Sequence, residues 1–238
     1  MDCEMYEEDS LSSGYLVANG SRVRTAFHAV SDWSRRHLNA GQGSTASAPV
    51  PVFIYDSSGK LLSSPDMDKA TAIFPRSNLD TSCVGRQITL PNNDLVEIQL
   101  DRVIGPPLPA TSTMPKAGEP IYVIGYPQRT ADRKAFGVPD SPGGQLRVSE
   151  GRAIPIEVMA RKEGLDPKDL TDETKREVRQ MLVSNADGAP GDSGGATVNA
   201  LGQVIGTYTA GYPADGSATP NHLSYSSNDT VLNFRFNK

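Results

Sequence analysis

Short runs in which apolar and polar residues alternate recur along this chain, and a period of two is typical of half-buried strands. Turn-forming residues separate the runs. In the first half, the runs lie at residues 15–17, 22–26, 52–55, 71–74 and 94–100. Residues 39–48 are rich in turn-forming residues and are expected to connect strands. This spacing predicts a small antiparallel barrel.

The second half follows a proline-rich stretch. Residues 105–115 include Gly-Pro-Pro-Leu-Pro, which cannot pair as a central strand and predicts a linker. Strand-like runs resume at residues 120–125 and 146–156. Residues 196–205 predict a strand, a glycine turn and another strand.

One segment is typical of a helix instead. Residues 166–182 begin with an Asp that can cap a helix and a Pro at the first helical position, with acids early and bases late. We expect a helical insertion in the second half. Two interpretations of it stay open: a flank that restricts access to a site, or a solvated surface feature.

The segment with the clearest chemical meaning is Gly-Asp-Ser-Gly-Gly at residues 191–195. Glycine adopts positive φ at no steric cost, so the backbone can fold around the serine and direct N–H groups at a carbonyl oxygen. Such a turn can expose a nucleophilic hydroxyl. Taken alone, the pattern also fits a plain surface turn.

A serine nucleophile needs a base and a group that orients the base. Of the three histidines, His28 lies among small residues at the end of an apolar strand, whereas His37 follows two arginines and is expected to be exposed. His222 lies near the end of the chain and is a weaker candidate for substrate contact. Asp94 opens an alternating run and can lie beneath the imidazole.

In the order His28, Asp94, Ser193, the sequence resembles the chymotrypsin and trypsin family of serine proteases. Residues 25–29 resemble the family's Thr-Ala-Ala-His block, and residues 94–100 resemble its Asp-Leu-Ala-Leu-Leu-x-Leu strand. The turn at residues 191–195 matches residue for residue, and segments 124–127 and 204–211 agree as well.

The resemblance implies an all-β, chymotrypsin-like fold of two antiparallel six-stranded β-barrels. We expect the first barrel over residues 1–104 with His28 and Asp94, and the second over residues 116–238 with Ser193. A C-terminal helix is expected near residues 230–236.

The implied function is that of a serine endopeptidase. His28 takes the proton of Ser193, and Asp94 orients the imidazole, with Asp101 and Asp80 as fallback acids. The backbone N–H groups of Gly191 and Ser193 would form the oxyanion hole.

Specificity follows from the same resemblance. Asp187, six residues before Ser193, would form the floor of the primary pocket and favour Lys or Arg. The strand after the turn would pair with an extended peptide substrate through Thr209, Ala210 and Gly211. Ala189 stands where trypsin has a bracing cysteine, so Asp187 as a plain exposed acid remains an alternative.

Activation departs from the family pattern. Asp192 would pair with a freshly cut N-terminal amine, but no Ile-Val-Gly-Gly type segment is present. Three interpretations remain: another partner holds Asp192, the pocket is constitutively formed, or Asp192 only stabilises the turn.

Two other classes of protein use the same features. Ser193, Asp215 and His222 obey the serine, acid, histidine order of α/β-hydrolases, whose nucleophile is followed by a helix, whereas this serine precedes a predicted strand. The second class is a catalytically inactive protease fold kept as a binding module.

Composition and charge limit the kinds of molecule that the chain is expected to bind. With 238 residues and a net charge of −5, the chain can form a sizeable core but lacks the basic face of a nucleic-acid-binding protein. No apolar run reaches membrane length, and no cofactor or metal is needed for the chemistry. We expect protein or peptide substrates.

The compartment depends on the N-terminus and the cysteines. We expect a secreted or periplasmic protein, or a cytosolic one if Met1 is the native start. Cys3 and Cys83 permit one disulfide or two free thiols.

Overall fold

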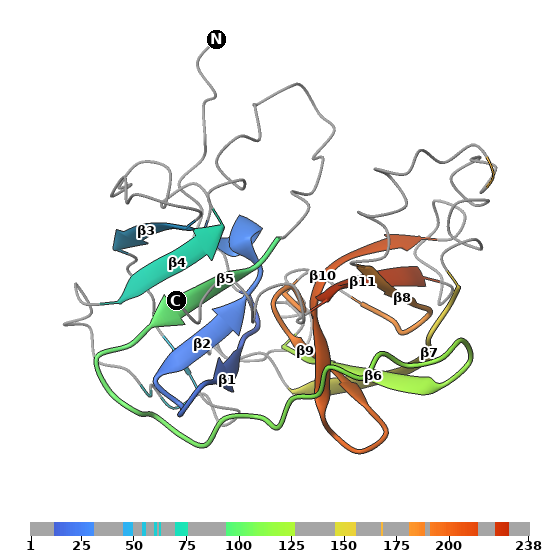
Figure 1. Cartoon of the computed structure of the whole chain (residues 1–238), viewed down its shortest axis with the longest axis horizontal. Helices are drawn as coiled ribbons and strands as arrows, with labels where there is room; N and C mark the ends of the chain where they lie inside the picture. The colour runs from blue at the N-terminus through green and yellow to red at the C-terminus, as the bar shows by residue number, and fades with distance from the viewer. Residues whose placement is uncertain are drawn as a thin grey trace, which may run out of the picture.

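Two antiparallel sheets dominate the computed structural model, and they lie side by side in Figure 1. The structure describes residues 12–30, 45–49, 54–55, 60, 62, 70–75, 94–126, 146–155, 168, 181–188, 191–213 and 222–228. Over these residues the regular elements are strands and one short 3-10 turn, so the all-β expectation is confirmed there. Closure of either sheet into a six-stranded barrel, and the division into two domains, stay predictions.

The first sheet holds the segments that carry His28 and Asp94. Its strands are β1 (Tyr15–Val17), β2 (Arg22–Thr25), β3 (Thr45–Pro49), β4 (Thr71–Pro75) and β5 (Val96–Gln99), in the spatial order β1-β2-β5-β4-β3. On one face, Val23 and Ile98 pack with Ala70 and Leu100 in a buried apolar cluster. Because β2 pairs directly with β5, Thr25 lies opposite Val96, and the residues just beyond these strand ends are neighbours.

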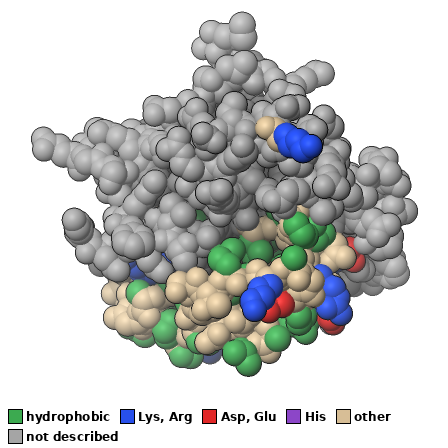
Figure 2. All heavy atoms as spheres, turned by 45° about the vertical axis from the view of Figure 1, so that its right-hand side comes forward, with side chains coloured by type: hydrophobic (Ala, Val, Ile, Leu, Met, Phe, Trp, Pro, Cys, Tyr) green, Lys and Arg blue, Asp and Glu red, His purple; other side chains and the backbone are tan. Residues whose placement is uncertain are grey.

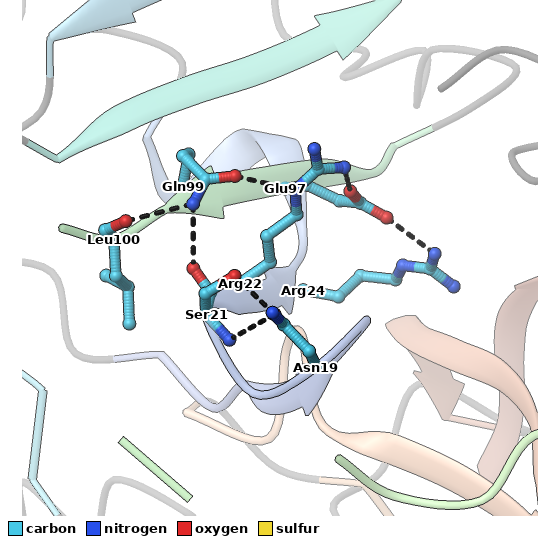
Figure 3. A network of polar contacts seen from close by, with 7 residues as sticks. All are labelled: Asn19, Ser21, Arg22, Arg24, Glu97, Gln99 and Leu100. Carbon is cyan, nitrogen blue, oxygen red and sulfur yellow. Dashed lines mark hydrogen bonds and ion pairs between the residues drawn. The ribbon is translucent and has the colours of Figure 1, made fainter. Parts of the chain in front are cut away.

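The opposite face of β2 and β5 carries a polar network (Figure 3). The carboxylate of Glu97, 3% exposed, accepts Nη2 of Arg24 at 2.6 Å and Nη1 of Arg22 at 3.0 Å. Gln99 extends the network through Nε of Arg22 at 2.7 Å. A buried carboxylate is tolerated only when paired, so these contacts depend on the register in which Arg24 faces Glu97. The network therefore selects the register that brings the ends of β2 and β5 together.

The second sheet holds the nucleophile turn. Its strands are β6 (Pro120–Gly125), β7 (Arg147–Arg152), β8 (Met181–Ser184), β9 (Ala196–Asn199), β10 (Val204–Pro213) and β11 (His222–Asn228), in the order β7-β6-β9-β10-β11-β8. An isolated bridge between Ala153 and Ser184 joins the two edges of this sheet, where Ile154 N–H donates to the Val183 carbonyl at 2.8 Å. The predicted strand, glycine turn and strand after residue 195 are present, with Gly202 at φ 73°.

The proline-rich segment at residues 105–115 contacts both sheets. Leu108 N–H donates to the Leu16 carbonyl of β1 at 3.0 Å. One residue later, the Pro109 carbonyl accepts Val204 N–H of β10 at 2.7 Å. The segment contains no strand, as its prolines predict, but its remaining polar groups hold the two sheets against each other.

Two expectations from the sequence are wrong. Residues 45–48, assigned to a turn-rich run, form most of β3, because their backbone pairs with β4. The predicted helix cannot extend to residue 182, since Met181 and Leu182 belong to β8. Leu182 and Val183 are buried in the core of the second sheet, and this tertiary packing overrides helical propensity.

Several other expectations fall outside the described residues. These are the two cysteines, His37, Asp80, Ala189, Asp215, the C-terminal helix and most of the helical insertion. Between residues 166 and 180 the structure describes exposed Lys168 alone. For them, as for the secreted or periplasmic location, the sequence-based predictions stand as predictions.

Candidate active site

His28 lies on a 3-10 turn, Phe27–Ala29, immediately after β2. Phe27 anchors the turn, since its side chain is 1% exposed and its N–H donates to the Asp94 carbonyl at 3.2 Å. The Asp94 side chain then contacts His28 twice: Oδ2 lies 2.6 Å from the ring Nδ1, and Oδ1 accepts the backbone N–H at 2.8 Å. Asp94 is 2% exposed. With the carboxylate against Nδ1, the ring nitrogen Nε2 is directed away from Asp94.

The environment of the ring raises the pKa of His28 above its ordinary value of 6.5. Burial of the ring opposes this and is the largest single influence, because it disfavours the charged form. The hydrogen bond that the ring donates to Asp94 and the negative charge of the Asp94 carboxylate together outweigh burial. The pair therefore favours the imidazolium, which is the state that a general base must reach.

The glycines of residues 191–195 form a sharp turn between the sheets. Gly191 and Gly194 have φ of 95° and 84°, a region that other residues rarely adopt. Gly194 N–H donates to the Tyr208 carbonyl at 2.7 Å, and Tyr208 N–H donates to the Gly195 carbonyl at 2.9 Å. A Cβ on Gly194 would lie 2.1 Å from Thr25 Oγ1, so only glycine lets the turn approach the end of β2. The turn that carries Ser193 thus lies against the strand that leads to His28.

The peptide groups of this turn have fixed directions. The Asp192 carbonyl accepts Gly195 N–H at 2.8 Å, so the N–H of Ser193, on the other side of the same trans peptide, points away from Gly195. Among the described residues, the N–H groups of Gly191 and Ser193 have no protein acceptor.

The carboxylate of Asp192 forms an ion pair with Arg147 of β7. Its carboxylate is buried, at 1% residue exposure, and Oδ2 lies 3.3 Å from Nη2 of Arg147. Arg147 at the start of β7 pairs with Gly125 at the end of β6. A Cβ on Gly125 would lie 2.5 Å from Asp192 Oδ1, so the missing side chain leaves space for the carboxylate beside Arg147.

Asp187 lies between β8 and the turn and is partly buried. Its Oδ1 is shielded from solvent and accepts no hydrogen bond from the described residues. Its backbone carbonyl accepts Nη2 of Arg147 at 2.9 Å, so a single guanidinium joins Asp187 to Asp192. Next to Asp187, a Cβ on Gly188 would lie 1.9 Å from the Tyr208 hydroxyl, so glycine is required there as well.

The three residues expected to bind substrate lie on β10, which pairs with β11 on one side. A register irregularity falls between Tyr208 and Ala210, where Thr209 lies. On the other side, β9 pairs with β10 only over Val204 to Thr207, and this pairing does not extend to Thr209, Ala210 and Gly211. His222 opens β11 opposite Pro213, outside the pair formed by His28 and Asp94.

Two residues at the site were not identified from the sequence: Arg147 and Ser13. Arg147 reaches Asp192 through the register of β6 and β7, and Ser13 donates to the Gly191 carbonyl across a separation of 178 residues. Neither contact has a local sequence signature.

A basic interface, a metal site or a membrane span would each require particular features of the described surface and side chains. On the face drawn in Figure 2, the coloured side chains mix basic, acidic and hydrophobic types rather than gathering into one basic area. Within the described ranges, no group of three or more His, Cys, Asp or Glu side chains could hold a metal ion. No described helix is long and apolar enough to cross a membrane.

The architecture and the turn together define a serine-protease-like fold, and the comparisons identify the family. The model of the trypsin-like peptidase domain matches residues 12–206, and the chain belongs to that family. The resemblance inferred from the sequence is therefore confirmed. No curated protein matches the chain.

Solved structures match the chain at low sequence identity. A serine endoprotease from Yersinia pestis has a TM-score of 0.50 and 16% identity, covering 97% of this chain and 58% of that one. The active form of the Rv3671c protease from M. tuberculosis has a TM-score of 0.47 and 18% identity, with 94% and 71% covered. The HtrA-type protease AlgW with decapeptide has a TM-score of 0.47 and 18% identity, with 93% and 49% covered. The chain thus spans little more than half of the Yersinia protease.

Proposed function

We propose that this chain is a serine endopeptidase that hydrolyses peptide bonds through Ser193, His28 and Asp94. The observation that carries the proposal is the double contact of buried Asp94 with the ring and the backbone of His28. A carboxylate held in this way fixes both the tautomer and the direction of the imidazole. The family to which the chain belongs supplies the expectation of peptide substrates.

In this mechanism, His28 Nε2 accepts the proton of Ser193 Oγ as the oxygen attacks the peptide carbonyl. The tetrahedral intermediate places its negative oxygen at the N–H groups of Gly191 and Ser193, where one donor is worth about 3 kcal/mol in the transition state. His28 then protonates the leaving amine, and water hydrolyses the acyl-enzyme by the reverse transfers.

A fluorophosphonate tests this function without assuming a preferred substrate residue. Intact mass should show one covalent adduct on the folded wild-type protein, and none on Ser193→Ala or His28→Ala, since an unactivated hydroxyl reacts slowly. The matched control is Ser21→Ala, which removes an exposed hydroxyl bonded to Asn19 and should label like wild type. Absence of an adduct on folded wild type would reject the protease and favour a binding module.

The primary specificity is proposed to be for Lys or Arg side chains. Asp187 supports this because its Oδ1 is shielded from solvent and accepts no hydrogen bond among the described residues. A cationic side chain would supply the missing partner and offset the cost of that buried oxygen.

Asp187→Ser is expected to lower kcat/KM for substrates with Lys or Arg before the scissile bond on the order of 100-fold. The same variant should change cleavage after Leu little, because no charge is lost there. A panel of peptides that differ only at this residue measures the ratio. Equal effects on basic and apolar substrates would show that Asp187 does not select the side chain.

A further inference from the structure

Ser13, just before β1, uses all of its polar groups to join three distant segments. Its N–H donates to the Ser193 carbonyl at 2.8 Å, and its Oγ–H donates to the Gly191 carbonyl at 2.7 Å. The same Oγ accepts the Tyr126 N–H at 2.7 Å, and its carbonyl accepts Thr25 Oγ1–H at 2.7 Å. Ser13 is 3% exposed, so solvent cannot replace these bonds.

The first consequence concerns the nucleophile turn. Ser13 binds the carbonyls of Gly191 and Ser193, and Gly195 N–H binds the Asp192 carbonyl between them. Three successive peptide planes are therefore held by their oxygen atoms. Because a trans peptide directs its N–H opposite to its carbonyl, the plane that carries the Ser193 N–H cannot rotate unless these bonds break. These bonds to the carbonyl oxygens therefore hold the Ser193 N–H, the candidate oxyanion donor, in a fixed direction.

The second consequence concerns the spacing between the catalytic groups. Thr25 ends β2, three residues before His28, and its hydroxyl holds the Ser13 carbonyl. The backbone of Gly194 packs against this same Ser13 carbonyl, to which a Cβ would come within 2.2 Å. Ser13 is thus bonded both to the strand that leads to His28 and to the turn that carries Ser193. Errors of about 1 Å between reacting groups can cost on the order of 100-fold in rate.

We propose that Ser13 is a positioning residue that sets the distance between His28 and Ser193 and holds the oxyanion turn in its active conformation. This inference rests on the proposed protease function. Ser13 touches neither Asp187 nor the expected substrate strand at residues 209–211 in any described hydrogen bond, so its effect should fall on the transition state rather than on substrate binding.

Ser13→Ala tests the proposal, because it removes both Oγ bonds and keeps the backbone bonds. We expect kcat to fall about tenfold to 100-fold with little change in KM, and the fluorophosphonate labelling rate per folded molecule to fall by the same factor. The acid limb of the pH profile should stay in place, since His28 and Asp94 are untouched. The matched control is again Ser21→Ala, which removes a hydroxyl bonded to Asn19 outside the site and should leave all three quantities unchanged.

Thr25→Val provides a second variant of nearly equal shape that removes only the bond to the Ser13 carbonyl. It should also lower kcat, and the double variant should lose less than the product of the single losses, because both act through one network. Normal kcat and labelling for folded Ser13→Ala would overturn the inference while the protease function stands. An unlabelled wild type would overturn the function, and the inference with it.

Discussion

Asp94→Asn is expected to lower kcat/KM by about four orders of magnitude, because an amide at this position no longer holds the catalytic tautomer of His28. The amide oxygen can still accept the His28 backbone N–H, which Asp94 Oδ1 accepts now at 2.8 Å. The fold should therefore survive, and the loss should appear in kcat. Steady-state kinetics with a peptide substrate measures it.

The same substitution should move the pH profile. The acid limb of kcat/KM reports protonation of His28, and its pKa is raised above 6.5 in the wild type, so activity should rise only above that pH. Without the carboxylate, burial remains and lowers the pKa of His28, so the limb should shift to lower pH. Profiles from about pH 5 to about pH 9 reveal the shift.

Asp101→Asn is the matched control for Asp94→Asn. Asp101 is exposed and follows β5, and the sequence alone left it open as an alternative orienting acid. Its substitution should change neither the rate nor the acid limb. A large loss of activity in Asp101→Asn, with Asp94→Asn near wild type, would show that Asp101 rather than Asp94 orients His28.

Arg147→Met is expected to lower kcat on the order of 1,000-fold. The Arg147 guanidinium contacts both the Asp192 carboxylate and the Asp187 backbone carbonyl, so its loss would free both groups. Removing the guanidinium takes away the cation that lies 3.3 Å from the buried Asp192 carboxylate and that offsets part of its desolvation cost. The turn at residues 191–195 would then rearrange to expose Asp192, and the oxyanion donors would be lost. Kinetics and urea denaturation of the folded variant measure both effects.

Two further variants separate charge from bulk at this position. Arg147→Lys keeps a cation and should retain more activity than Arg147→Met. Arg147→Met combined with Asp192→Asn removes both charges, and it should recover part of the lost stability. A wild-type kcat in Arg147→Met would show that the contact between Arg147 and Asp192, at 3.3 Å, does not hold the turn at residues 191–195.

The sequence predicted those parts of the site that lie in local motifs. The glycines of residues 191–195, the block around His28 and the strand that begins after Asp94 each have a short-range pattern, and the structure shows the corresponding elements. The motifs together predicted that Asp94 lies beneath the imidazole of His28. This contact follows from the pairing of β2 with β5, which the motifs did not predict. The complete triad and the oxyanion hole remain predictions that the labelling experiment tests.

Other features depend on contacts that no local pattern encodes. Arg147 faces Asp192 only because Gly125 is its register partner, and the β3 residues Thr45 to Ala48 form a strand only because β4 supplies the backbone bonds. Likewise, Leu182 belongs to a strand because its side chain is buried against other core residues of the second sheet. Propensity is a weak guide where tertiary pairing decides the outcome.

The bonds from Ser13 to residues 191 and 193 span nearly the whole length of the described chain. Contacts so far apart in sequence form slowly, since most of the intervening chain must be ordered before they close. During synthesis, the segments that carry His28 and Asp94 emerge from the ribosome well before the turn at residues 191–195, which completes the proposed site. The proposed protease would therefore acquire its activity only in the last stage of folding, after most of its chain has become ordered.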